Sequence, residues 1–214
     1  MRNKFNKQLE QLNTELTAMG ALCEEAIGTA ARSFRENDPS LLPAVKEAEI
    51  EIDHKERDIE TLCMKLLMEQ QPVARDLRTI SSAMKMISDM ERIGDQAADI
   101  AEILKYVLRI DVPGAVHISD MASAAIKMVT GAVDSFVRRD LEAAKAVQAG
   151  DDVVDGLFLQ VKQELTKLIL HDPKEAEACL DLLMIAKYLE RIGDHATNIA
   201  EWVEYSITGM HKGM

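Results

Sequence analysis

The stretch "ERIGDQAADIAE", from Glu91 to Glu102, returns as "ERIGDHATNIAE", from Glu190 to Glu201, with nine of its twelve positions unchanged. The likeness extends outward from these two stretches. Ser33-Phe34 recurs as Ser135-Phe136, displaced by 102 positions. After the proline that begins the third predicted helix of each copy, Pro72 and Pro173, the displacement becomes 99. Self-similarity over most of a chain is typical of a repeated structural unit. The sequence therefore predicts an internal duplication.

Each copy of the repeat reads as helix. No segment alternates apolar and polar residues as a half-buried strand does. The dipeptides Asp38-Pro39 and Asp172-Pro173 place a helix N-cap before a proline suited to the first helical position. Apolar periodicity predicts helices over residues 3–36, 39–70, 72–109, 114–138, 140–171 and 173–208. Helices of this length favour an all-α, antiparallel bundle.

The boundary between the copies is expected in "RIDVPGAVHISD", residues 109–120, where Pro113 and Gly114 interrupt the helical pattern. Residues 1–111 and 112–214 then each form a three-helix unit. The predicted fold is two tandem three-helix bundles related by a pseudo-twofold axis.

Composition narrows the functional classes. The 214 residues are 47% hydrophobic and 29% charged, with a net charge of -12 and a pI near 4.9. Such a chain repels phosphate backbones and anionic lipids, which disfavours direct binding to nucleic acid or membrane. The N-terminal residues lack the apolar segment of a secretory signal, and no apolar run approaches the roughly 20 residues of a membrane span. These features predict a cytoplasmic protein without membrane insertion. The three cysteines, at unrelated spacings, are expected to be buried free thiols: Cys23, Cys63 and Cys179.

Acidic pairs four residues apart are the candidate functional residues. At 100° per residue, Asp95 lies about 40° from Glu91, and both carboxylates are expected within the apolar stripe of their helix. Glu49 and Asp53 border the apolar stripe of the preceding helix in the same way. The duplication supplies the equivalent pairs in the second copy: Asp151 with Asp155, and Glu190 with Asp194. Gly94 and Gly193 lie between members of these sets, where we expect the close approach of a neighbouring segment or a ligand.

Carboxylates gathered at a helix seam need protons, cationic side chains or metal ions as partners. Facing helices could bring four carboxylates to one multi-cation centre, and all-oxygen ligands favour hard ions such as Mg, Mn, Ca or ferric iron. The alternative is a set of solvated acids paired with Arg92, Arg191 and other basic residues. His195, whose counterpart is Gln96, is expected beside a site rather than in it.

The motifs "ERIGDQAADIAE", "LERIGDHATNIAE" and "PVARDLR", residues 72–78, resemble the PhoU family of phosphate-signalling proteins, and the likeness covers the whole chain. The resemblance implies two PhoU repeats, a homodimer and multinuclear metal clusters of Mg, Mn or Fe. It also implies negative regulation of the phosphate regulon, through a link between the ATPase subunit of the phosphate ABC transporter and a sensor histidine kinase. The family's metal ligands would correspond to Glu49, Asp53, Glu91, Asp95, Asp151, Asp155, Glu190 and Asp194. The copies differ at Gln96 against His195 and at Asp99 against Asn198, which predicts unequal sites.

Three functional classes follow from these observations. A signalling adaptor without catalytic activity fits the acidic composition, the absence of a nucleophile-and-base arrangement and the resemblance. A ferritin-like di-metal enzyme would need an ExxH motif from each of two helices, and only Glu51 to His54 supplies one. The third class is a purely structural helical scaffold. Direct phosphate binding is not predicted, because the sequence displays neither a glycine-rich loop nor a cluster of arginines.

Overall fold

A computed structural model describes residues 2–69, 72–108 and 117–210. In this part of the chain every element is helical and no strand occurs. The long helices are α1 (Arg2–Glu36), α2 (Leu42–Glu69), α3 (Ala74–Val107), α4 (Ile118–Arg138), α5 (Leu141–His171) and α6 (Ala176–Thr208). Two short 3-10 helices, η1 (Pro39–Leu41) and η2 (Pro173–Glu175), precede α2 and α6. The all-α prediction is confirmed, with helix ends shifted by a few residues. The predicted repeat boundary and the predicted start of the fourth helix lie outside the described residues.

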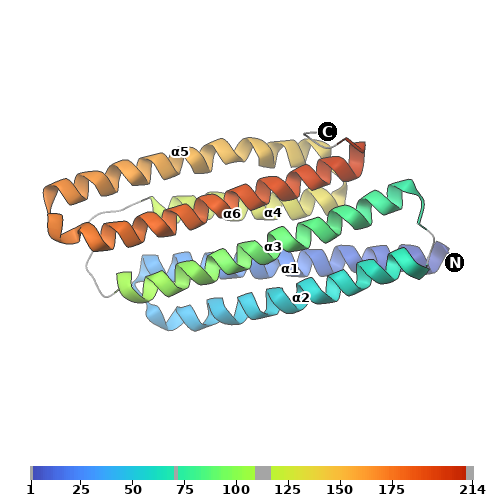
Figure 1. Cartoon of the computed structure of the whole chain (residues 1–214), viewed down its shortest axis with the longest axis horizontal. Helices are drawn as coiled ribbons and strands as arrows, with labels where there is room; N and C mark the ends of the chain where they lie inside the picture. Colours follow the sequence, from blue (N-terminus) through green and yellow to red (C-terminus); the bar gives the residue numbers. More distant parts are fainter. Residues whose placement is uncertain (1, 70–71, 109–116, 211–214) are drawn as a thin grey trace.

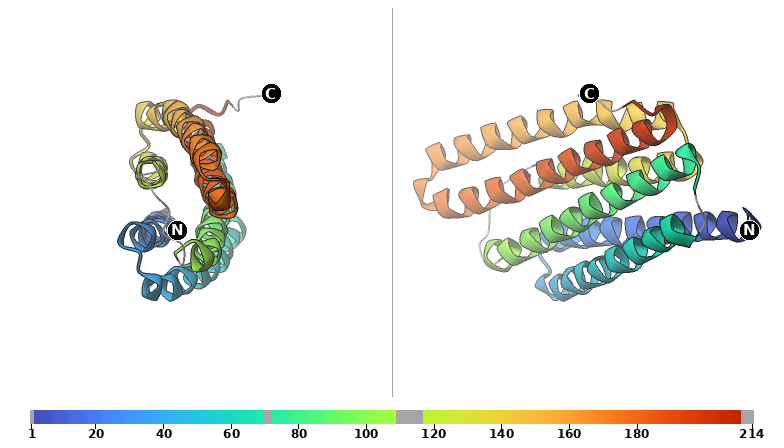
Figure 2. Two further views of the ribbon diagram at one scale, coloured as in Figure 1. Left: turned by 90° about the vertical axis from the view of Figure 1, so that its left-hand side faces the viewer. Right: turned by 45° about the vertical axis from the view of Figure 1, so that its right-hand side comes forward.

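The six helices form two layers. Helices α2, α3, α6 and α5 lie side by side in a curved layer, and α1 and α4 pack against its inner side (Figures 1 and 2). Within each repeat the three helices contact one another, α1 with α2 and α3, and α4 with α5 and α6. The repeats meet along α3 with α6 and α1 with α4. The buried apolar side chains of all six helices form one continuous core.

Equivalent contacts across the α3–α6 interface reveal the pseudo-twofold relation. The amide of Asn198 in α6 donates to Asp89 in α3 over 3.3 Å. Burial, and then the nearby carboxylate of Asp99 in α3, raise the pKa of Tyr188 in α6. With the displacement of 99, Asp89 corresponds to Tyr188 and Asp99 to Asn198. These are therefore the same contact seen from the two sides of a pseudo-twofold axis, and the two helices run antiparallel.

The helix ends follow from local chemistry. Asp38 accepts a hydrogen bond from the backbone N–H of Ser40 over 2.9 Å. The side chain of Ser40 and then this backbone bond lower the pKa of Asp38. Asp172 caps η2 in the same way, with the N–H of Lys174 at 3.1 Å. Asp140 caps α5 by accepting from the N–H of Ala143 over 3.0 Å. The Asp-Pro signals thus mark the predicted starts, since the side-chain oxygen satisfies an N–H that the first turn leaves unpaired.

Two further expectations concern the interior and the membrane. Cys23, Cys63 and Cys179 are buried free thiols, as predicted, and burial raises the pKa of Cys23 and of Cys63 to about 12. Among the helices of the described ranges, none has the length and apolar content needed to cross a bilayer.

Candidate metal centres

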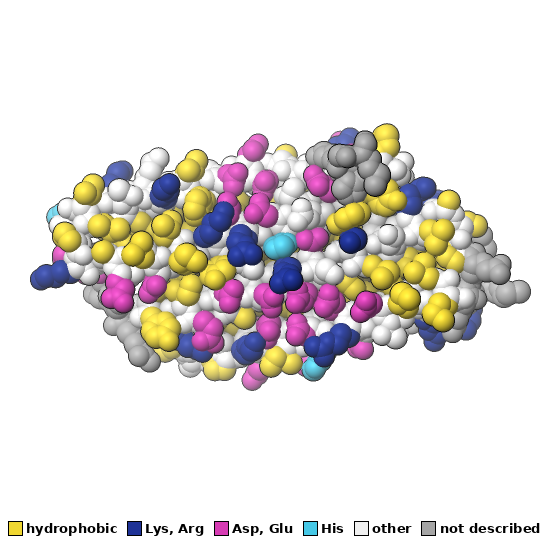
Figure 3. Space-filling model, in the orientation of Figure 1, with side chains coloured by type: hydrophobic (Ala, Val, Ile, Leu, Met, Phe, Trp, Pro, Cys, Tyr) yellow, Lys and Arg dark blue, Asp and Glu magenta, His cyan; other side chains and the backbone are white. Residues whose placement is uncertain are grey.

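Two groups of acidic side chains lie over the middle of the outer face of the four-helix layer, one over α2 and α3 and the other over α5 and α6 (Figure 3). We call the first group, between α2 and α3, the first acidic patch: Glu49, Asp53, Glu91 and Asp95. The second acidic patch lies between α5 and α6: Asp151, Asp155, Glu190 and Asp194. The fold thus brings the predicted pairs to adjacent helices and places the two patches in equivalent positions of the two repeats.

The carboxylates lie at the rim of the apolar seam rather than inside it. Only Glu49 is buried, with 9% of its surface exposed, whereas Asp155 and Asp194 are exposed and the other five are intermediate. Residues at the centre of the stripes, such as Ile52 and Ile87, are fully or almost fully buried. A position 40° from the centre of a stripe therefore reaches the edge of the helix–helix contact, where a carboxylate keeps part of its hydration.

In the first acidic patch, charges from the two helices act on each other. Burial raises the pKa of Glu91, and the next largest cause is the charge of Asp95. Burial also raises the pKa of Asp95, to which Asp53 and Glu49 of the facing helix contribute. Carboxylates resist deprotonation when like charges are close and water is partly excluded. The patch is therefore short of positive charge.

Basic side chains of the same helices partly compensate the first acidic patch. Lys46 Nζ lies 2.7 Å from Glu49 Oε2. Arg92, which is predicted to form structural ion pairs, lies 3.6 Å from both Glu91 Oε2 and Asp95 Oδ2. These ion pairs join neighbours on one helix, and the charge of Asp95 in α3 also acts on Lys46 in α2. The repulsion between α2 and α3 is therefore only partly compensated.

The second acidic patch has the same pattern with fewer cations. Burial and the charges of Asp155 and Asp194 raise the pKa of Asp151. Burial and Glu190 raise the pKa of Asp194, against the opposite effect of Lys187. Lys187 forms an ion pair with Glu190 three residues along α6. The second patch is thus also an unbalanced set of carboxylates from two helices.

The two patches differ at one position that the sequence reasoning missed. Glu56 adjoins the first acidic patch, accepts a hydrogen bond from Ser88 over 3.3 Å, and has a pKa raised by burial. The counterpart of Glu56, at the displacement of 102, is Phe158, and the counterpart of Ser88, at the displacement of 99, is Lys187. Lys187 Nζ lies 5.6 Å from the Phe158 ring centre. Helical periodicity could have identified Glu56, which lies one turn after Asp53. The first patch therefore offers one more carboxylate than the second.

The glycines of the repeated motif let the helices approach closely. A Cβ on Gly94 would lie 3.0 Å from Ile52 Cδ1 in α2. A Cβ on Gly193 would lie 3.4 Å from Val154 Cγ1 and 3.6 Å from Asp151 Oδ1 in α5. The close approach expected at these glycines is therefore made by side chains of the facing helix, and it brings the two acidic pairs of each patch together.

His195 lies between the two patches. Its Nδ1 is 2.9 Å from Asp89 Oδ1 across the α3–α6 interface. That His195 stands beside a metal site rather than in it stays a prediction. The charge of a protonated His195 lowers the pKa of Asp194, with a smaller effect than burial, Glu190, Lys187 and Asp155 have.

The donor chemistry of both patches suits a hard cation, since the available ligands are carboxylate oxygens. As the side chains lie, no three His, Cys, Asp or Glu groups in the described ranges stand close enough to hold one ion. Four of the acids are instead paired with Lys46, Arg92 or Lys187, namely Glu49, Glu91, Asp95 and Glu190. Chelation would require these ion pairs to give way to the metal ion. Metal binding by these eight residues stays a prediction.

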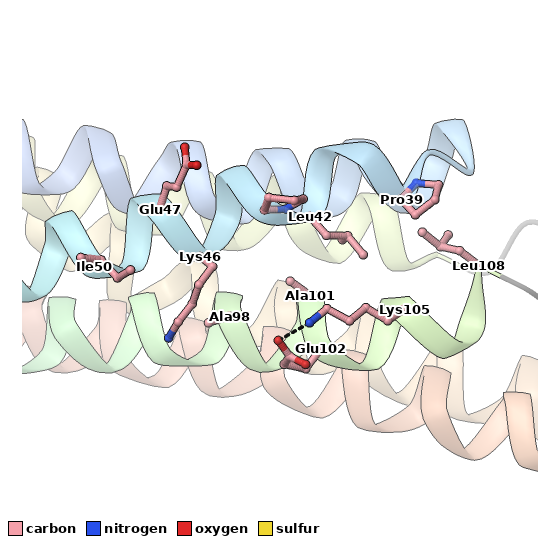
Figure 4. A pocket seen from close by; sticks show the side chains of 11 residues that line it. Pro39, Leu42, Lys46, Glu47, Ile50, Ala98, Ala101, Glu102, Lys105 and Leu108 are labelled. Carbon is pink, nitrogen blue, oxygen red and sulfur yellow. Dashed lines mark hydrogen bonds and ion pairs between the residues drawn. The ribbon is translucent and has the colours of Figure 1, made fainter.

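A groove opens beside the first acidic patch, between the start of α2 and the end of α3 (Figure 4). Its volume is about 520 Å³, and its walls are largely apolar, with Leu42, Ile50 and Ala101 among them. Lys46 reaches across it from α2 toward Ala98 in α3. Lys46 is therefore shared between the groove and the acidic patch.

Comparison with known proteins identifies relatives that match both three-helix units. The family model for the PhoU domain matches residues 16–104 and again residues 118–203. The chain is 36% identical over 208 residues to the phosphate-specific transport system accessory protein PhoU homolog of Pseudomonas aeruginosa, covering 96% of this chain and 86% of that protein. It is 34% identical to the homolog of the same name from Clostridium acetobutylicum, covering 97% of this chain and 96% of the relative.

Solved structures agree with the sequence comparisons. The crystal structure of PhoU from Pseudomonas aeruginosa superposes with a TM-score of 0.90 at 35% identity, covering 96% of this chain and all of that one. The phosphate transport system regulatory protein PhoU from Streptococcus pneumoniae superposes with a TM-score of 0.89 at 24% identity, which supports the fold. The two family matches, residues 16–104 and 118–203, lie one in each three-helix unit, and the boundary between residues 111 and 112 stays a prediction.

Proposed function

The chain belongs to the PhoU family, and we propose that it is a regulatory accessory protein of a phosphate transport system. The observation that carries this proposal is the pair of family matches, which span both repeats and nearly the whole described chain. The relatives are named as accessory proteins rather than enzymes. An adaptor role without catalysis is consistent with both.

The adaptor would act in the cytoplasm, between the ATPase subunit of the phosphate ABC transporter and a sensor histidine kinase. In high phosphate it would hold the kinase in a state that represses the phosphate regulon. The extended outer face offers separate surfaces to two partners, because the acidic patches lie at its middle and apolar side chains gather toward both ends (Figure 3). Leu180 and Met184, one turn apart on α6, are 58% and 46% exposed. Such apolar side chains are suited to a protein partner or to a homodimer interface.

Metal ions of the Mg, Mn or Fe class are the proposed cofactors of the two acidic patches. Glu49, Asp53, Glu91 and Asp95 would hold them in the first patch, and Asp151, Asp155, Glu190 and Asp194 in the second. The bound ions would neutralise carboxylates that now repel one another across each helix pair. Since Glu56 adjoins only the first patch, we expect unequal occupancy.

Deletion and complementation test the regulatory proposal. Deleting the gene should leave the phosphate-starvation response active in high phosphate, and the wild-type gene should restore repression. Normal repression in the deletion strain would show that this chain does not regulate the regulon. A metal-free scaffold, the competing function, is tested separately by elemental analysis of the purified protein, which should find bound Mg, Mn or Fe.

A further inference from the structure

Three arginines come together at one end of the molecule, far from the acidic patches. The N-terminal end of α3 and the C-terminal ends of α4 and α6 lie at this end (Figure 1). Arg75 and Arg78 belong to the first turns of α3, and Arg139 caps the C-terminus of α4. A concentration of positive charge is unexpected in a chain with a net charge of -12. The sequence alone does not reveal this cluster of arginines, because Arg139 and the residue that it contacts on α3, Thr79, are 60 positions apart.

Two of the three, Arg75 and Arg139, line a groove of about 310 Å³, which we call the arginine groove. Its polar lining residues are Asn13 from α1, Arg75, Asp76 and Thr79 from α3, and Arg139 from α4. The Arg139 guanidinium donates to Thr79 Oγ1 over 3.2 Å, which holds it on the face of α3 that carries Arg75 one turn below. The groove thus has cationic side chains on two elements.

Little negative charge offsets these arginines. Within the described ranges, no carboxylate forms an ion pair with Arg75, Arg78 or Arg139. Asp76 accepts the N–H of Val73 over 3.4 Å and is the one acid among the groove's lining residues. Burial lowers the pKa of Arg139, as do the charges of Arg75 and Arg78, and the charge of Asp76 opposes them with the smallest of the four effects. An arginine remains cationic near neutral pH. An anion in the groove would relieve this repulsion.

The backbone at Arg139 carries a cost that its repeat counterpart avoids. Arg139 has φ 55 and ψ 43, in the left-handed region that favours glycine and asparagine. Its counterpart at the displacement of 102 is Asn37, with φ 51. Arg75 corresponds to Lys174, Thr79 to Ala178 and Arg78 to Glu177. The arginine set is thus confined to one repeat, where a bulky cation occupies a position that asparagine fills more easily.

Arg78 has a structural explanation. Its guanidinium carbon would lie 3.5 Å from a Cβ on Gly209, the residue that ends α6. A cation there is stabilised by the unpaired carbonyls of a helix C-terminus. Arg75 and Arg139, which line the groove, have no such explanation, and the Thr79 contact uses one of the five donors of Arg139.

We propose that the arginine groove binds a tetrahedral oxyanion of the phosphate class, either free phosphate or the phosphoryl group of a phosphomonoester. Arginine forks match phosphate oxygens in pairs, and the N–H groups at the start of α3 add a positive field on the same side. This inference goes beyond the proposed adaptor function and does not depend on it, because it concerns a binding property of the isolated chain.

The test is calorimetric titration of the full chain with orthophosphate at low, constant ionic strength. A chelator is present throughout, so that phosphate cannot bind through metal ions at the acidic patches. Sulfate and glycerol phosphate are titrated in parallel. Saturable binding is expected, and tighter binding of orthophosphate than of glycerol phosphate identifies the free ion as the ligand. The reverse order identifies a phosphomonoester.

Three variants locate the site. Arg75→Gln and Arg139→Asn should each weaken binding about tenfold or more, since each removes a charge-assisted contact. The matched control is Arg138→Gln, which removes the same charge from the neighbouring residue, whose guanidinium pairs with Asp134 at 3.0 Å. This control should bind as the wild type does. Arg139→Asn should keep or raise the melting temperature, because asparagine suits this backbone conformation, so lost binding cannot be ascribed to misfolding.

Two results would overturn the proposal. One is the absence of saturable binding of all three anions by the wild-type chain. The other is an equal loss of affinity in all three variants, which would mean that anion binding depends on the net charge of the protein and not on the arginine groove.

Discussion

Replacing Asp95 and Asp194 by asparagine removes one carboxylate from each acidic patch while keeping side-chain size and helical position. In the metal-free protein the change is small. Asp95 Oδ2 lies 3.6 Å from Arg92 Nη1, with the two side chains 37% and 61% exposed, and exposed pairs of this kind contribute about 0–1 kcal/mol. Its loss is opposed by relief of the repulsion from Asp53 and Glu49. The melting temperature should therefore hold or rise, by at most about 2–4 °C.

With metal present the expected effect is larger. A ligand at 100 times its dissociation constant stabilises the folded chain by about 2.7 kcal/mol per site. For a chain of this size, that corresponds to a rise in melting temperature of about 5–10 °C. Asp95→Asn with Asp194→Asn should abolish most of this rise and lower the metal content measured by elemental analysis.

The assay is thermal unfolding by circular dichroism, with Mn or Mg and with a chelator. The matched control is Glu102→Gln with Glu142→Gln, since both glutamates are exposed and pair with a lysine three residues later, Glu102 with Lys105 at 2.5 Å and Glu142 with Lys145 at 3.0 Å. The control should keep the full metal-induced rise. If the Asp95 and Asp194 variants lose stability equally with and without metal, the carboxylates are structural partners of basic groups and the metal-site reasoning is wrong.

Three further predictions concern the same fold. Folding raises the pKa of Asp95 and Asp194, so their contribution to metal-free stability is greatest below the unfolded pKa near about 4 and is lost as the pH rises through the folded pKa. The stability gained by replacing both with asparagine should therefore grow between pH 4 and 7. A gain that does not depend on pH would refute this prediction. Gly94→Leu should reduce the free energy of unfolding by about 1–3 kcal/mol through overpacking against α2, and so lower the melting temperature. Gly156→Leu, where nothing lies within 4 Å of the added Cβ, should not. Asp140→Ala removes the N-cap of α5 and should cost about 1 kcal/mol, measured by urea unfolding; no change would mean that this cap is not needed.

Local signals in the sequence predicted most of the fold. The Asp-Pro dipeptides and the apolar periodicity identified the helices, because caps and stripes depend on residues a few positions apart. The two copies of ERIGD identified the repeat and the acidic pairs. The symmetric form of the α3–α6 contact could have been anticipated from the duplication, but not which helices form it.

Long-range proximity limited the prediction of the sites. Arg75 and Arg139 line one groove only because the start of α3 lies beside the end of α4 in the folded chain. His195 contacts Asp89 across a separation of 106 positions. The burial of the acids was also overestimated, since helical angle alone does not say how closely the next helix covers a seam. Glu56 was within reach of the same periodicity and was missed because its counterpart is Phe158.

The central claim is that this chain connects a phosphate transporter to its sensor kinase. The most direct test is affinity capture of the tagged chain from phosphate-replete cells, followed by identification of the retained proteins. We predict that the transporter's ATPase subunit and the sensor histidine kinase are both retained, and that an unrelated tagged helical protein of similar charge retains neither. Recovery of neither partner with the tagged chain, under conditions where both are expressed, would contradict the adaptor function.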